Sequence, residues 1–222
     1  MIAVAGGKGG SGKTTTTLGL ARALSRRGAR AIAADADWDL PNLARLASET
    51  ADSDRPSPAT VVEAVRSQDS TVSDSSPPTV LAAPDASDSV DPAPTFGALA
   101  DTVPDGAPTL LDCPAGASPD AAAPLRTADR SLLVTPLRRA ALRDAAKTAA
   151  IARRLDCPPL GVVAVRADSV PDAVADLLGC PVLGRVPSAT PVPLADSTVR
   201  SAYDRLARRL VREHGAGRWR VA

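Results

Sequence analysis

The segment that most constrains this chain is a glycine-rich loop close to its start. Residues 6–14 read Gly-Gly-Lys-Gly-Gly-Ser-Gly-Lys-Thr, and the stretch from Gly7 to Thr14 satisfies the phosphate-loop spacing G-x-x-x-x-G-K-[ST]. An apolar run at 2–5 precedes the loop, and an Ala/Leu-rich run follows it. A strand, a tight loop and a helix in this order favour nucleotide binding over the alternative of an ordinary glycine-rich turn.

Each residue type in the loop has a chemical reason to be there. Glycines let backbone N–H groups approach phosphate oxygens without a Cβ in the way. Lys13 would place a cation on the β- and γ-phosphates, and the Thr14 hydroxyl would take one position around Mg²⁺. We expect ATP with Mg²⁺, contacted by Gly7, Lys8, Gly9, Gly10, Ser11, Gly12, Lys13, Thr14 and Thr15.

Short apolar runs alternate with helical patterns along the chain. The expected strands, bounded by Gly, Pro or Asp, are 2–5, 29–34, 80–83, 109–111, 132–135, 161–165 and 182–186. The expected helices are 14–27, 40–47, 60–66, 96–102, 120–126, 137–155, 171–178 and 195–213. This alternation predicts a doubly wound α/β fold, in which helices flank a mostly parallel sheet, within a single domain over 1–222.

Two segments differ in composition from the rest of the predicted domain. Residues 48–94 are acidic and rich in Ser and Pro, and we expect solvated, partly mobile surface loops there more than a binding segment. Residues 199–222 form a basic C-terminal helix and tail, in which arginines surround one apolar face. This patch fits DNA phosphates or anionic lipid; the alternative is a solvated face of a helix packed on the sheet.

The overall composition argues against several classes of protein. The net charge is +1, so no strong overall attraction to nucleic acid or membranes is expected. Three separated cysteines form no C-x-x-C pair and there is one histidine, which argues against disulfides, zinc sites and histidine triads. No apolar run reaches the ~20 residues that span a bilayer, and no signal peptide is evident, so we expect a cytoplasmic location.

Lysine is scarce, and this makes the first loop unusual. Only Lys8, Lys13 and Lys147 are lysines among 26 Lys and Arg residues. The bias is typical of a GC-rich genome and suggests a halophile, although strongly halophilic proteins are usually more acidic. An ordinary phosphate loop needs Lys13 but not Lys8.

The run K-G-G-x-G-K-T-T from Lys8 to Thr15 resembles the deviant Walker A signature of the ParA/MinD superfamily of P-loop ATPases, and a haloarchaeal MinD-like member is one type that would fit. In that family the early lysine reaches across a dimer interface to the nucleotide of the partner subunit. The resemblance implies the same role for Lys8; the alternative is a solvent-facing loop lysine.

The resemblance extends to an acidic segment after the second expected strand. Asp35-x-Asp37, followed by Asn-Leu, looks like the first switch of the family. Matched by position, Asp37 would orient the attacking water and Asp35 would lie in or near the outer shell of Mg²⁺. Asp39 departs from the family pattern. The alternative is an acidic surface loop in an Asp-rich chain.

Two later segments also resemble the family. Asp112-Cys-Pro-Ala-Gly116 is similar to the Walker B and second-switch segment, which implies that Asp112 holds a water on Mg²⁺ and that Gly116 lets the loop respond to the γ-phosphate. Cys113 replaces a small hydroxyl residue, and we expect a buried small hydrophobe more than a reactive thiol. Arg166 and Pro187 end strands that resemble those flanking the adenine.

The resemblance therefore implies an ATPase that hydrolyses ATP to ADP and phosphate and dimerises with itself in the ATP state. An unidentified protein would activate it, and it would position cell-division, chromosome, plasmid or polar components at the nucleoid or the inner membrane face. No iron–sulfur cluster is expected, because paired cysteines are missing. The alternatives are a metabolic ligase or amidotransferase component of the cobyrinate or dethiobiotin kind, and a nucleotide-binding regulator that has lost hydrolysis.

Overall fold

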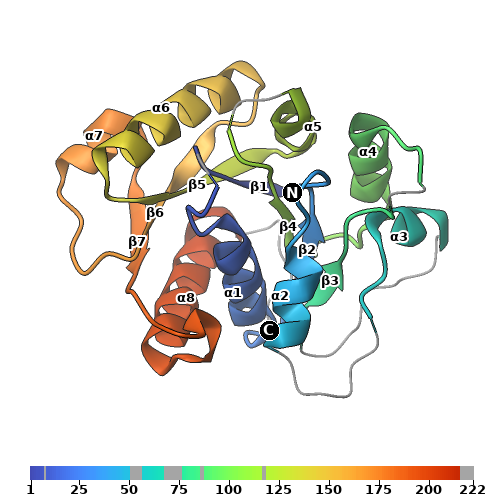
Figure 1. Cartoon of the computed structure of the whole chain (residues 1–222), viewed down its shortest axis with the longest axis horizontal. Coiled ribbons are helices and arrows are strands. Elements are labelled where there is room, and N and C mark those ends of the chain that lie inside the picture. The colour runs from blue at the N-terminus through green and yellow to red at the C-terminus, as the bar shows by residue number, and fades with distance from the viewer. Residues whose placement is uncertain (8, 51–56, 68–76, 86–87, 117–118, 216–222) are drawn as a thin grey trace.

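A parallel sheet forms the centre of the computed structural model, which describes residues 1–7, 9–50, 57–67, 77–85, 88–116 and 119–215. Within these residues the sheet has seven strands in the order β3-β2-β4-β1-β5-β6-β7 (Figure 1). The strands are β1 (Ile2–Ala5), β2 (Ile32–Asp35), β3 (Thr79–Leu81), β4 (Thr109–Asp112), β5 (Arg130–Pro136), β6 (Pro159–Val165) and β7 (Val182–Val186). All neighbouring pairs are parallel.

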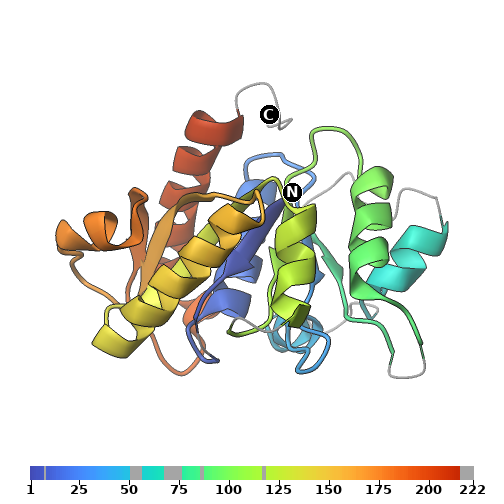
Figure 2. The same ribbon diagram turned by 90° about the horizontal axis from the view of Figure 1, so that it is seen from above.

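Helices connect the strands and cover both faces of the sheet (Figure 2). They are α1 (Lys13–Ser25), α2 (Leu43–Glu49), α3 (Val61–Ser67), α4 (Pro92–Thr102), α5 (Pro119–Thr127), α6 (Arg139–Arg154), α7 (Ala173–Leu178) and α8 (Ser197–Leu210). A short 3₁₀ turn, Pro193–Ala195, precedes α8, and a π-helical turn, Val211–Gly215, follows it. The predicted doubly wound α/β fold is confirmed by this arrangement.

The alternation of side chains along each strand divides the core into two layers. Ile2 and Val4 of β1 pack with residues of α1, α2 and α8 on one face. Ala3 and Ala5 pack on the other face, where Phe96 of α4 belongs to the same apolar cluster. Strands buried on both faces are near-continuously apolar, which is why the sequence IAVA forms β1. Because β1, β2 and β4 are parallel neighbours, their carboxyl ends lie at the same edge of the sheet.

The observed boundaries differ from the expected ones mainly at helix starts. The helix expected at 96–102 begins at Pro92, because the Asp91 side chain accepts a hydrogen bond from the Ala93 N–H and caps it. The helix expected at 195–213 begins at Ser197, because Asp196 caps it in the same way. Elsewhere the boundaries agree within a few residues.

The described parts of 48–94 contain α3 and β3, so this stretch is not entirely loop. The rest of it, 51–56, 68–76 and 86–87, lies outside the described residues, and so does the end of the basic tail, 216–222. The extent of the domain therefore stays a prediction. In the part of the chain that is described, no helix is long and apolar enough to cross a membrane.

Candidate functional site

The phosphate loop joins the carboxyl end of β1 to the start of α1. A Cβ on Gly6 would lie 2.5 Å from the carbonyl oxygen of Val134, so this position requires glycine. A Cβ on Gly7 would lie 2.1 Å from the Cβ of Asp144 on α6, so this position requires glycine too. The start of the loop is therefore held between β5 and α6. Lys8, which we predict to reach a partner subunit, lies outside the described residues.

The tip and the end of the loop have space for a ligand. Gly9 and Gly10 are exposed, and no atom lies within 4 Å of where their Cβ atoms would be. Gly10 and Gly12 have φ angles of +70° and +91°, a conformation that favours glycine. Gly12 is the N-cap of α1, and no side-chain hydrogen bond caps the helix there. The first N–H groups of α1 thus face the loop, as anion binding requires.

Two polar side chains are buried in the loop. Lys13 is 7% exposed and Ser11 is 5% exposed. The Ser11 hydroxyl has no hydrogen-bond partner among the described residues, although buried hydroxyls normally have one. A phosphate oxygen in the loop would supply that partner, so Ser11 fits the predicted ligand. Thr14 and Thr15 follow in the first turn of α1 and are half-buried.

Two aspartates end neighbouring strands beside the loop. Asp35 ends β2 and Asp112 ends β4, and these two residues pair in register across the sheet. Asp112 also pairs with Val4 of β1, two residues before the loop begins at Gly6. Both carboxyl groups are buried, at 1% and 2% exposed. The strand ends that carry Asp35 and Asp112 therefore lie beside the strand that leads into the phosphate loop.

Asp112 connects the strand end to the first residues of α1. Burial raises the pKa of Asp112 to about 7; the Thr14 hydroxyl opposes this shift, and the Asp35 carboxyl adds to it. The nearby Lys13 ammonium and the Thr17 hydroxyl also lower this pKa. Thr17 Oγ1 donates to Asp112 Oδ1 at 3.2 Å and to the Lys13 carbonyl oxygen at 3.0 Å. The residue predicted to bind Mg²⁺, Thr14, thus lies close enough to the buried Asp112 carboxyl group to lower its pKa.

This donor set suits a hard cation that is shared with phosphate. Hydroxyl and carboxylate oxygens are the ligands that Mg²⁺ prefers. In the described residues, no cluster of three or more His, Cys, Asp or Glu side chains suited to a metal ion is found. Mg²⁺ is usually bound through few protein groups together with phosphate oxygens and water. Thr14, with Asp112 behind it, would hold the ion in that way.

Asp35 organises the loop that follows β2. Its carboxylate accepts three hydrogen bonds, each 3.0 Å long, from the backbone N–H groups of Asp37, Asn42 and Leu43. Burial raises the pKa of Asp35 to about 6, and these hydrogen bonds limit the rise. Asp35 therefore fixes the path from β2 to α2. Its predicted place near Mg²⁺ stays a prediction.

Asp37, the candidate for orienting water, lies in this same loop and is half-buried. Its Oδ1 accepts a hydrogen bond from the Leu40 N–H at 3.3 Å. Trp38 donates its indole N–H to the Asp35 carbonyl oxygen at 3.1 Å and packs on Phe96 of α4, with ring centroids 5.2 Å apart. Asp37 is thus carried by a loop that is attached to both β2 and α4.

Cys113 and Gly116 follow β4 in the second predicted switch segment. Cys113 is buried, and burial raises the pKa of its thiol well above the usual range. A thiol in this state is unreactive, which confirms the expectation of a small buried hydrophobe. Gly116 has a φ of +89° and open space around it, while its response to the γ-phosphate stays a prediction. Asp39, the departure from the family pattern, is exposed.

Arg166, predicted beside the adenine, contacts the phosphate loop itself. It follows β6 with a φ of +53°, which is uncommon for a residue other than glycine. Its Nη2 donates to the Gly10 carbonyl oxygen at 2.8 Å. Pro187 follows β7 and is half-buried. Contacts of Arg166 and Pro187 with adenine stay predictions.

Sequence reasoning missed two side chains that support the site. Thr17 lies four residues after Lys13, so the helical period places both side chains on one side of α1 and was an available signal. Tyr203 of α8 lies 3.3 Å from Thr16 through its hydroxyl. A Cβ on Gly19 would lie 2.4 Å from the Tyr203 ring, so α1 is shaped to receive it.

Solved structures of low sequence identity share this fold. The septum site-determining protein MinD from Pyrococcus horikoshii OT3, complexed with Mg-ADP, is 22% identical with a TM-score of 0.77, covering 97% of this chain and 96% of that chain. The MinC:MinD cell division protein complex from Aquifex aeolicus is 21% identical with a TM-score of 0.73, covering 95% of each. Cobyrinic acid a,c-diamide synthase from Mycobacterium smegmatis, with bound ATP analog and magnesium, is 23% identical with a TM-score of 0.70, covering 98% and 96%.

The sequence also matches a family model directly. Residues 2–200 match the CobQ/CobB/MinD/ParA nucleotide binding domain. Among curated proteins, none matches the chain in sequence. The family match covers the phosphate loop and both acidic segments, and it confirms the resemblance that the loop carried. The chain belongs to the CobQ/CobB/MinD/ParA nucleotide-binding family.

Proposed function

We propose that this chain is an ATP-dependent switch ATPase of the ParA/MinD type. It binds ATP with Mg²⁺, hydrolyses ATP to ADP and phosphate, and forms a homodimer in the ATP state. The observation that carries the proposal is the buried Asp112 carboxyl group, which accepts a hydrogen bond from Thr17 and lies near Lys13 and Thr14, where the glycine-rich loop enters α1. The Mg-ADP and the ATP analog with magnesium in two structural neighbours support the choice of ligands.

Each residue of the site has a place in the hydrolysis. Backbone N–H groups of the loop and the Lys13 ammonium hold the β- and γ-phosphates. Asp37 positions a water in line with the γ-phosphorus; the water oxygen bonds to the phosphorus as the bond to the bridging oxygen breaks, ADP leaves, and the proton of the water passes to the phosphate product or to solvent. Mg²⁺, when bound at Thr14, neutralises charge on the phosphates. Lys8 reaches the nucleotide of the second subunit.

The cycle would position cell-division, chromosome, plasmid or polar components. A partner protein stimulates hydrolysis and so reopens the dimer. The structural neighbour that is a MinC:MinD complex supports a partner of this general kind. The protein would be cytoplasmic and would bind reversibly to the nucleoid or the inner membrane face. Its site residues act only while ATP is bound.

Replacing Asp37 separates binding from hydrolysis. In Asp37→Ala, ATP affinity measured by calorimetry stays within about threefold, while phosphate release falls by about 10²-fold or more, because water loses its positioned acceptor. Asp37→Asn keeps an acceptor for the Leu40 N–H and should be equally slow. Asp39→Ala, a change in an exposed neighbour, is the matched control and keeps normal turnover. Unchanged turnover in Asp37→Ala would refute the water-positioning role.

Replacing Lys8 tests the dimer. Light scattering of the wild-type chain should show a dimer in ATP and a monomer in ADP. In Lys8→Ala the ATP dimer is lost, whereas Lys147→Ala, whose side chain is 73% exposed, dimerises normally. A Lys8→Ala protein that still dimerises in ATP would remove the cross-subunit role of this lysine.

A ligase or amidotransferase of the cobyrinate kind is the second candidate, and the M. smegmatis neighbour is the observation that favours it. Such an enzyme needs a carboxylic acid acceptor before ATP is consumed at an appreciable rate. Phosphate release is therefore measured without any acceptor and with a corrinoid carboxylic acid. Release that requires the acceptor would support the ligase and count against the switch.

A further inference from the structure

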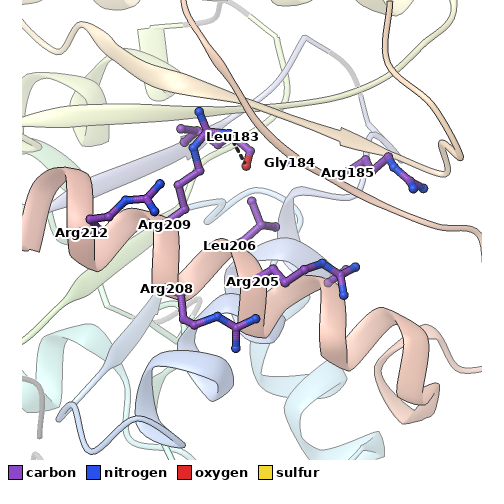
Figure 3. A pocket seen from close by; sticks show the side chains of 9 residues that line it. Leu183, Gly184, Arg185, Arg205, Leu206, Arg208, Arg209 and Arg212 are labelled. Atoms are coloured by element: carbon purple, nitrogen blue, oxygen red, sulfur yellow. Dashed lines mark hydrogen bonds between the residues drawn. The ribbon is translucent and has the colours of Figure 1, made fainter.

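A concave surface lies between β7 and α8, three strands away from β1 in the sheet (Figure 3). We call it the β7–α8 groove. Its volume is about 580 Å³. Pockets of roughly 300–1,000 Å³ are typical of binding sites. None of the residues that line it takes part in the nucleotide site, so the groove requires its own explanation.

The floor of the groove is apolar. Leu183 of β7 and Leu206 of α8 are both buried there, and Ala202 lies one turn before Leu206. Gly184 has no side chain, and a Cβ there would lie 2.8 Å from Leu206 Cδ2. Gly184 therefore lets α8 lie close to the strand and leaves a narrow apolar strip beneath the rim.

The rim of the groove is made of guanidinium groups. Five arginines surround the floor, and Figure 3 shows those of α8 spreading out around Leu206: Arg185, Arg205, Arg208, Arg209 and Arg212. Arg209 and Arg212 share one carboxylate, Glu213, at 2.7 Å and 3.5 Å. The other three have no ion pair among the described residues. The rim thus carries a large excess of positive charge over a hydrophobic strip.

One wall of the groove is a strand edge. Within the described residues β7 ends the sheet and pairs with β6 only. Arg209 donates to the carbonyl oxygens of Val182 and Leu183, at 2.8 Å and 3.1 Å, and so covers the first part of this edge. The later part, at Gly184 and Arg185, lines the groove. An edge strand is a ready template for pairing with another extended chain.

We propose that the β7–α8 groove binds an acidic, extended segment of a partner protein. Carboxylates of the segment pair with the arginines of the rim, since guanidinium groups bind carboxylates in a bidentate manner. An apolar side chain between those carboxylates lies against the methylene stems of the rim arginines, above the buried Leu183 and Leu206. The backbone of the segment runs beside Gly184 on the open edge of β7.

The spacing of the arginines defines the segment further. Arg205 lies in α8 and Arg212 in the π-helical turn that follows it, and the two are separated by about 10 Å at a rise of about 1.5 Å per residue. An extended chain covers this distance in roughly three residues. Acidic residues that reach both arginines are therefore about three positions apart, and the apolar residue occupies one of the positions between them. The proposal does not depend on ATP hydrolysis and holds in either nucleotide state.

The groove fits this segment better than it fits nucleic acid or lipid. A phosphodiester backbone has no apolar side chain for the floor, and among the described residues no aromatic ring on which a base would stack lines the groove. A membrane surface is broad, whereas the apolar strip here lies at the bottom of a recess. A peptide uses all three elements: the rim, the floor and the strand edge.

The test uses the full chain and a fluorescein-labelled peptide in which aspartate and leucine alternate. We expect saturable binding by fluorescence anisotropy in both ADP and ATP. A peptide with serine in place of aspartate, and one with serine in place of leucine, should each bind at least about tenfold more weakly. Arg205→Glu/Arg208→Glu should lose the peptide while keeping wild-type affinity for ATP, which shows that the variant is folded.

Two further variants make the comparison sharp. Arg126→Glu/Arg154→Glu makes the same change of charge on α5 and α6, on the opposite face of the sheet, and should leave peptide binding unchanged. Arg205→Lys/Arg208→Lys keeps the charge but not the bidentate geometry and should give intermediate affinity. Hydrogen exchange should slow at 184–186 when the peptide binds, because the strand edge becomes paired.

Several results would overturn the proposal. Equal peptide affinity in the Glu double variant and its control would show that the groove is not the site. No peptide binding, together with sedimentation on duplex DNA or phosphatidylglycerol vesicles that the Glu double variant abolishes, would assign the rim to phosphate groups instead. Self-association of the chain that only the groove variant prevents would assign it to a second copy.

Discussion

The phosphate loop and the β7–α8 groove both attract anions, but they are built in opposite ways. The loop relies on backbone N–H groups and on Lys13, which is 7% exposed and lies near buried Asp112. The groove relies on arginine side chains such as Arg205 and Arg208 that extend into solvent. Buried charges interact strongly and in one geometry, whereas exposed charges are screened and adjustable. The chain's net charge of +1 gives no indication of either site, because it sums charges over the whole molecule.

The difference bears on what each site recognises. The loop begins with Gly6 and Gly7, whose Cβ positions are occupied by other atoms, so its shape is fixed before a ligand arrives. Long arginine side chains lose rotamer freedom when they bind, so the groove selects by charge pattern more than by shape. The first site suits one small ligand, and the second suits a class of segments. Four predictions test this contrast.

Loss of Lys13 should have the largest effect. In Lys13→Ala, the affinity for ATP falls by roughly 3 kcal/mol, or about a hundredfold, because a buried cation on the phosphates is removed. Calorimetric titration with ATP and Mg²⁺ measures the change, and Arg154→Ala, an exposed cation on α6, serves as the control. Peptide binding in the groove should be unaltered. An ATP affinity within threefold of wild type would contradict the claim that the buried Lys13 ammonium binds the phosphates.

The second-largest effect should be a difference in salt dependence between peptide binding in the groove and ATP binding in the loop. Raising the salt concentration from about 0.05 to 0.5 M shortens the screening length from roughly 14 to 4 Å. Binding of the Asp/Leu peptide to the groove should weaken about tenfold or more, whereas ATP affinity at constant free Mg²⁺ should change much less. Parallel titrations by anisotropy and calorimetry give both numbers. Equal sensitivity of the two ligands would abolish the distinction between an exposed and a buried site.

Arg166 is an exposed arginine, like those of the groove, but it contacts the phosphate loop. Its replacement should have a moderate effect on ATP affinity. Arg166→Gly removes the guanidinium bonded to the Gly10 carbonyl oxygen and also relieves a backbone φ of +53°. ATP affinity should fall by about three- to tenfold while the unfolding temperature does not drop. Arg166→Ala loses the same contact but keeps the backbone strain, so it should be the less stable variant. An unchanged ATP affinity in both variants would show that the contact is incidental.

The smallest expected effect concerns the contact between the helices that carry the two sites. Tyr203→Phe removes the 3.3 Å hydrogen bond to Thr16 but keeps the ring on Gly19. Its free energy of unfolding in urea should decrease by about 1 kcal/mol. Thr16→Val should cost a similar amount, and the double variant should lose less than the sum. Strict additivity would mean that the two hydroxyl groups do not interact.

The phosphate loop was predictable because its chemistry is local. The spacing from Gly7 to Thr14 and the flanking strand and helix all lie within one stretch of sequence. The end of β4 at Asp112 was similarly visible, since a polar residue follows an apolar run. By contrast, the contact from Arg166 to Gly10 joins residues 156 apart, and no periodicity signals it.

The boundaries of strands and helices were also hard to predict from local sequence. The expected strand at 29–34 is observed as β2, Ile32–Asp35, because the sequence Ala-Arg-Ala-Ile-Ala-Ala does not mark where pairing begins. Asp35 was expected to follow that strand, yet it is the last residue of β2 and is buried. Its carboxylate accepts three hydrogen bonds from backbone N–H groups of the following loop. Only the tertiary structure supplies those donors.

The contact between Trp38 and Phe96 gives the first switch loop an optical reporter of its own. The chain contains two tryptophans, Trp38 and Trp219. In a Trp219→Phe protein all tryptophan emission comes from Trp38, whose indole is hydrogen-bonded to Asp35 and packed on an aromatic ring. Any rearrangement that carries Asp37 toward a nucleotide must disturb that indole. Stopped-flow fluorescence can therefore time the movement of the loop without an attached dye.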